Sequence, residues 1–242
     1  MTRTTNARIA GFTFLFYIAT AITSMVLSGQ TTSGAEGTVA KLASIAQHAS
    51  LVRADIVLTL LQAACALVLA VTLYALTRDQ DPDLAVMALC CRVSEGVVIA
   101  AVSSLVTLAL LSVATAGTAA AGADAAAGNA LGALLLKMGD WTGLIAATCF
   151  AVGSTLFSWL LLRGRMIPIA LAWLGVLASV LLVVILPLQL AGLFGSVTWG
   201  SSVSWLLVLP MLVFEVALAL WLLIKGVAMP ANRQSPPAHA RE

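Results

Sequence analysis

The chain has 242 residues, of which 61% are hydrophobic and only 9% are charged. Soluble domains carry about 25% charged residues, so this sequence has too few polar side chains to cover a surface in water. The net charge of +2 is dispersed and forms no basic stripe suited to phosphates, which argues against nucleic acid as a partner. Composition therefore predicts an integral membrane protein whose surroundings are the lipid bilayer.

Six hydrophobic stretches are long enough to cross a bilayer, which takes about 20 helical residues. They cover residues 9–27, 52–76, 84–112, 139–162, 168–193 and 203–227. The first exceeds the apolar region of a secretory signal, which has about 7–15 residues, so we expect it to be retained. We predict an all-α, polytopic membrane protein, a bundle of about six transmembrane helices in one membrane domain at residues 9–229.

The connections between these stretches carry their own signals. Residues 36–49 predict a short interfacial helix on the outer side, with Leu42 and Ile45 on its apolar face. In the loop at residues 78–83, Asp81 or Asp83 can cap the next helix, and Pro82 suits its first turn.

Two further segments are low in complexity. Residues 116–130 are rich in alanine and glycine and are predicted as a loose outer connection, although the alanines could extend a helix. Residues 230–242 are polar, contain three prolines and are predicted to be a disordered cytoplasmic tail.

Basic residues predict the orientation of the bundle. With a cytoplasmic N-terminus (residues 1–8), eight basic residues face inward and three face outward, a bias that follows the positive-inside rule. The inner set is Arg3, Arg8, Arg78, Arg163, Arg165, Lys225, Arg233 and Arg241, and the outer set is Lys41, Arg53 and Lys137. The chain is then predicted to cross the cell membrane several times, with both termini in the cytoplasm.

Three charged residues lie deep inside the predicted spans, away from the span ends. Arg92 and Glu95 are three residues apart on the third span and so share a helix face, and Glu215 lies in the sixth. From a helix rise of about 1.5 Å per residue, all three lie roughly 12–17 Å from the inner ends of their spans. Because a charge in the bilayer centre costs about 2.5–3.5 kcal/mol or more, we expect these side chains to meet in the bundle interior.

The charge balance of this predicted centre leaves two interpretations open. One arginine faces two glutamates, so one glutamate is protonated or a cation completes the balance in a dry interior. Such a centre would serve ligand binding or proton coupling. Alternatively, the buried charges only hold helices together.

A second group of polar residues is predicted near the outer surface. It comprises His48, Arg53, Asp55, Lys137, Asp140 and Trp141. These residues could form the mouth of a cavity, with Arg53 or Lys137 attracting an anionic head group. The alternative is interfacial charge with an aromatic anchor, which is common in membrane helices.

No catalytic or cofactor motif accompanies these residues. The two histidines, His48 and His239, are too few for a membrane di-haem or a three-histidine zinc site. The four cysteines lie in apolar runs without a Cys-x-x-Cys spacing, which is typical of small packing residues. We therefore predict no catalytic residue, no metal site and no cofactor, and an enzyme is the least favoured class.

Several short motifs, taken together, resemble a known bacterial family. They are Arg8-Ile9-Ala10-Gly11, Arg92-x-x-Glu95-Gly96, Asp140-Trp141, Arg165-x-x-Pro168, and Glu215 with Trp221 and Lys225-Gly226. Their order and spacing resemble domain-of-unknown-function family 4386 over residues 8–227. The resemblance implies a compact multi-helix membrane protein and transfers no activity.

Two functional hypotheses follow from these observations. In the first, the chain binds a small molecule or lipid at the intramembrane polar site formed by Arg92, Glu95 and Glu215, with proton-coupled transport as one form of that activity. In the second, it is a non-catalytic structural or regulatory membrane protein. The sequence leaves homo-oligomerisation open.

Overall fold

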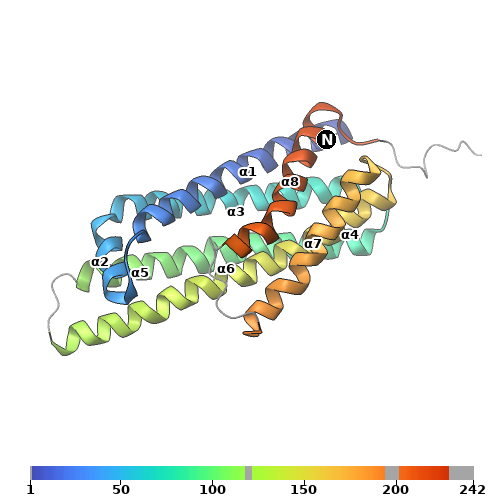
Figure 1. The fold of residues 1–242 in the computed structure, drawn as a ribbon. Coiled ribbons are helices and arrows are strands. Elements are labelled where there is room, and N and C mark those ends of the chain that lie inside the picture. The colour runs from blue at the N-terminus through green and yellow to red at the C-terminus, as the bar shows by residue number, and fades with distance from the viewer. Residues whose placement is uncertain (1, 118–121, 194–201, 229–242) are drawn as a thin grey trace, which may run out of the picture. The chain divides into compact units, whose positions relative to one another are not determined.

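The computed structural model describes residues 2–117, 122–193 and 202–228, with side chains from residue 208 onward in the last segment. Within these residues the chain is helical and contains no strand (Figure 1). The helices are α1 (Arg3–Thr32), α2 (Gly37–Gln47), α3 (Ala49–Thr77), α4 (Pro82–Val97), the π-helix η1 (Val98–Ser103), α5 (Ser104–Gly117), α6 (Ala123–Arg163), α7 (Ile169–Leu190) and α8 (Ser202–Ile224).

Five helical stretches of the described chain are long and apolar enough to cross a membrane. They are Arg3–Thr32, Ala49–Thr77, Pro82–Gly117, Ala123–Arg163 and Ile169–Leu190, with a shorter apolar stretch at Val208–Ile224. Large apolar side chains on these helices are exposed, including Phe12 at 64% and Leu177 at 63%. Long apolar helices with many exposed large apolar side chains are typical of membrane spans, and the predicted all-α, polytopic membrane fold is confirmed.

Helix boundaries differ from the sequence predictions at several places. The alanines after Gly122 are helical: they form the first turns of α6, which begins at Ala123 and has 41 residues. Residues 116–130 are therefore not a loose connection throughout. The predicted disordered tail, residues 230–242, lies outside the described residues.

The described chain divides into two compact units. Unit 1 contains the described residues up to Leu15, Leu67–Val93 and those from Ala147 on, and unit 2 contains Phe16–Ala66 and Ser94–Ala146. Helices α1, α3, α4 and α6 each contribute one part to each unit. The two units are described separately below.

Unit 1 includes the loops that join α3 to α4 and α6 to α7. Asp81 caps α4 by accepting a hydrogen bond from the Leu84 backbone N–H at 3.2 Å, one of the two caps that the sequence allowed. The same carboxylate pairs with Arg163 at 3.1 Å, and Arg3 lies 3.7 Å from Asp79. These ion pairs join the start of α1 and the end of α6 to the loop between α3 and α4. Most of the basic residues predicted as cytoplasmic lie in or next to these three segments.

Unit 2 contains the short helix α2. Leu42 and Ile45 are buried in a cluster with Val52, Ile56 and Leu111, which join α2 to α3 and α5. The predicted short helix with an apolar face is therefore present, between Gly37 and Gln47.

Candidate functional site

Arg92 is the most deeply buried large polar side chain of unit 1, with 1% of its surface exposed. Its guanidinium carbon lies 4.9 Å from the centre of the Phe150 ring, a cation–π contact between α4 and α6. Gly153, one turn further along α6, makes room for the arginine stem, because a Cβ atom there would lie 3.0 Å from Arg92 Cγ. A buried cation on an apolar helix is thus held by an aromatic face and a glycine.

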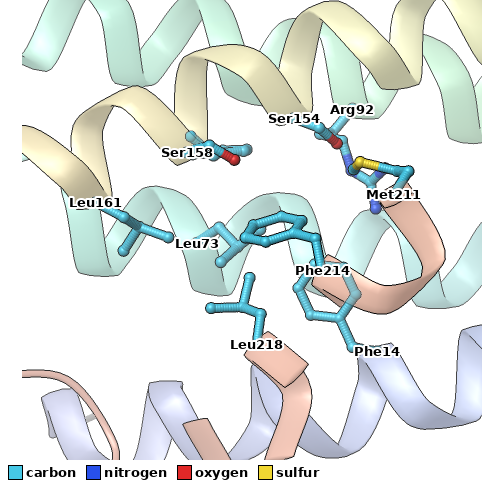
Figure 2. Close-up of a pocket in the computed structure, with 10 residues that line it drawn as sticks. Phe14, Leu73, Arg92, Ser154, Ser158, Leu161, Met211, Phe214 and Leu218 are labelled. Carbon is cyan, nitrogen blue, oxygen red and sulfur yellow. The ribbon is translucent and has the colours of Figure 1, made fainter. Parts of the chain in front are cut away.

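A small cavity adjoins Arg92 within unit 1. Its volume is about 10 Å³, and Figure 2 shows the arginine at its side together with Ser154 of α6 and Met211 of α8. The other lining residues are Phe14, Leu73, Phe157, Ser158, Leu161, Phe214 and Leu218. A water molecule needs about 10–15 Å³ on this measure, so the cavity has room for about one water and not for an organic molecule.

Glu215 belongs to the same unit and is 6% exposed. It lies four residues after Met211 on α8, and residues at that spacing share a helix face. Met211 lines the Arg92 cavity, so Glu215 lies on the face of α8 that contributes to this lining. Arg92 and Glu215 both have interaction partners.

Glu95 belongs to unit 2, and 1% of its surface is exposed. The Tyr17 hydroxyl of α1 donates a hydrogen bond to Glu95 Oε1 at 2.9 Å. Three residues after Glu95 the helix widens into the π-helix Val98–Ser103. Short π-helical segments inside α-helices are frequent at functional sites, and Glu95 is the buried charged residue next to this segment.

Burial of Arg92, Glu95 and Glu215 agrees with the expectation that they avoid lipid. Glu95 and Arg92 fall in different units, however, and a common centre of all three residues stays a prediction.

The six residues predicted near the outer surface have individual surroundings within unit 2. Asp55 accepts hydrogen bonds from the hydroxyls of Ser24 and Ser28, the latter at 3.2 Å. His48 Nδ1 lies 2.9 Å from the Ser44 carbonyl oxygen. The exposed members of the group are Arg53, Lys137, Asp140 and Trp141.

A larger cavity in unit 2 does not involve that group. It has a volume of about 200 Å³ and is lined by α2, α5 and the start of α6, at Val39, Leu42, Ala43, Val113, Ala114, Gly117, Ala125, Gly128 and Asn129. None of the six predicted residues lines it. Their role as the mouth of a cavity therefore stays a prediction.

Sequence reasoning missed Tyr17, Ser24 and Phe150. Tyr17 could have been found, because it is one of only two tyrosines and lies eight residues into the first predicted span. Together with Thr20 and Ser24 it also repeats at helical spacing. Phe150 could not have been singled out, since one phenylalanine in an apolar span carries no signal of its partner.

Long apolar helices with exposed apolar side chains define a polytopic α-helical membrane protein, and three of its charged residues are buried. The family model for a domain of unknown function, DUF4386, matches residues 9–226, so the chain belongs to that family. The search of curated proteins and the search of solved structures each gave no match. Family membership agrees with the resemblance seen in the sequence and assigns no activity.

Proposed function

We propose that this membrane protein binds a proton at Glu95 and couples that binding to the transport of a small molecule or lipid. The observation that carries the proposal is the placement of Glu95: a carboxyl group with 1% exposure, on an apolar span, held by the Tyr17 hydroxyl at 2.9 Å. Buried ionisable groups in membrane spans are costly and commonly serve ion or proton pathways.

The size of the Arg92 cavity argues against an organic ligand at that residue. A volume of about 10 Å³ admits about one water molecule. A proton needs no pocket, only a carboxyl oxygen and a route for water. The transported molecule would bind elsewhere on the chain or in another conformation of it.

Labelling with an apolar carbodiimide tests the proposal. The reagent reacts with a protonated carboxyl, whose O–H adds across a C=N bond and leaves a stable acyl adduct that mass spectrometry locates. We expect an adduct on Glu95 in acidic solution that diminishes in alkaline solution as the carboxyl loses its proton. Glu95→Gln removes the adduct, and the exposed Glu36→Gln serves as the matched control. A folded protein with no adduct on Glu95 at either pH would contradict the proposal.

A structural role is the second candidate, and the surroundings of Arg92 favour it for that residue. Its contact with Phe150 and its close fit to Gly153 join α4 to α6 within unit 1. A residue held in this way needs no ligand to account for its burial. Replacing Arg92 would then lower stability and leave the Glu95 adduct in place.

A further inference from the structure

Two helices of unit 2 carry polar side chains along facing sides. On α1 these are Tyr17, Thr20, Ser24 and Ser28, at intervals of three or four residues that place them on one helix face. Bonds at both ends fix where this row points: Tyr17 reaches Glu95 of α4, and Ser24 and Ser28 reach Asp55 of α3.

Helix α3 presents a matching row. Asp55, Thr59 and Gln62 are spaced by four and three residues and are all half-buried. Within unit 2, α1 ends and α3 begins beside α2, so the two helices run in opposite directions (Figure 1). The distance from Asp55 to Gln62 along α3 is therefore about equal to the distance from Ser24 to Tyr17 along α1. Seven residues at a helix rise of about 1.5 Å give roughly 10 Å in each case.

The hydroxyls of these rows can accept hydrogen bonds from water. The Thr20 hydroxyl donates to the Tyr17 carbonyl at 2.8 Å, and the Thr59 hydroxyl donates to the Asp55 carbonyl at 2.9 Å. Each hydroxyl oxygen therefore keeps acceptor lone pairs. Hydroxyl and amide groups at these positions offer hydrogen bonds to water that leucine or valine would not.

Asp55 stands where the rows meet the surface. It is half-buried, and its partner Ser28 is exposed. This end of unit 2 carries α2 and is the side that the basic residues predict as outer. The other charged or titratable side chains of the unit, apart from tyrosine and cysteine, are exposed or half-buried: Glu36, Lys41, His48, Arg53, Asp124, Lys137 and Asp140.

We propose that the facing rows of α1 and α3 form a water-filled path for protons, which opens at Asp55 and ends at Glu95. This inference rests on the proposed proton-binding role of Glu95 and adds the route and its side. A proton from outer water moves along the row and forms an O–H bond with the Glu95 carboxylate, and the hydronium that supplied it becomes water.

Cysteine accessibility tests the path without reference to Glu95. In a chain whose four cysteines are replaced by alanine, Thr59→Cys and Gln62→Cys are treated with a charged, membrane-impermeant thiol reagent from the outer side. The controls are Leu60→Cys and Leu61→Cys, at the same depth on α3 but exposed to lipid. A charge in lipid costs about 2.5–3.5 kcal/mol, so we expect path positions to react at least about tenfold faster. Equal, slow reaction at all four positions would overturn the path.

The role of Asp55 is tested by the speed of protonation. After sudden acidification of the outer solution, the protonated Glu95 carboxyl is followed by its infrared C=O band. We expect Asp55→Asn to slow the appearance of the band and to leave its final height unchanged. An unchanged rate would remove Asp55 from the path and leave the proposed function standing. Absence of the band in the parent protein would instead contradict the proposed function itself.

Discussion

Arg92 and Glu95 lie three residues apart on α4, yet their surroundings differ in kind. Arg92, in unit 1, is packed against the Phe150 ring and fits over Gly153, beside a cavity for about one water. Glu95, in unit 2, accepts a hydrogen bond from Tyr17, the first hydroxyl group of the polar row on α1. Charges three residues apart on one apolar helix can therefore differ in their surroundings: a cation packed against an aromatic ring in one unit and a carboxyl group that accepts a hydrogen bond from a phenol in the other.

Loss of the packed cation should have the largest effect. Arg92→Ala removes the guanidinium and its stem from a site with 1% exposure and leaves a cavity, so we expect a loss of roughly 3 kcal/mol, as for large-to-small core changes. Thermal unfolding in detergent measures it, with the exposed Arg78→Ala as control. Equal melting temperatures for the two variants would show that packing does not explain the burial of Arg92.

Tight packing of unit 1 can be tested away from the charge. A side chain at Gly175 would overlap the Phe214 ring and lie 2.7 Å from Ser158 Oγ, so Gly175→Val should cost about 1–3 kcal/mol. The control is Gly143→Val, where nothing lies within 4 Å. If both variants unfold at the same temperature, unit 1 is more loosely packed than the account requires.

The aromatic contact is expected to contribute less. Phe150→Leu keeps an apolar side chain and removes the ring face under Arg92, so stability should fall by about 0.5–2 kcal/mol. Phe12→Leu, at a ring that is 64% exposed, is the matched control. A double change with Arg92→Ala should cost less than the sum of the two single changes, because both remove the same contact. Additive costs would argue against a direct interaction.

The smallest effect on stability is expected at Tyr17. Tyr17→Phe removes one hydrogen bond, a loss of about 1 kcal/mol, and should shift the infrared band of the Glu95 carboxyl. Tyr74→Phe, which changes the chain's other tyrosine, should leave that band unmoved. An unshifted band in Tyr17→Phe would mean that the phenol does not act on Glu95.

The sequence was a good guide wherever composition and periodicity decide the outcome. Apolar length predicted the membrane helices, and Asp81 with Pro82 predicted the start of α4, because capping is local. The burial of Arg92, Glu95 and Glu215 follows from the cost of charge in lipid. These features depend on the residue itself and its nearest neighbours in the chain.

Contacts between side chains on different helices could not be predicted from the sequence. Phe150 under Arg92 and Tyr17 on Glu95 depend on which helix faces which, and apolar spans of similar composition do not encode that choice visibly. The π-helix after Glu95 was also missed, since Val98–Ser103 reads as an ordinary apolar helix. The alanine- and glycine-rich residues 116–130 allowed either a loose connection or a longer helix, and from Ala123 on the structure has the helix, as the high helix propensity of alanine favours.

The central claim is that the Glu95 carboxyl gains and loses a proton inside the membrane. Infrared spectra of the protein in lipid, recorded while the pH is varied, observe that group directly. We predict a carboxylic acid C=O band that grows on acidification in the parent protein and in Glu36→Gln, and that remains in part when the Glu95→Gln spectrum is subtracted from the parent spectrum. The same pH-dependent band in Glu95→Gln, or a parent spectrum that does not change with pH, would contradict the account.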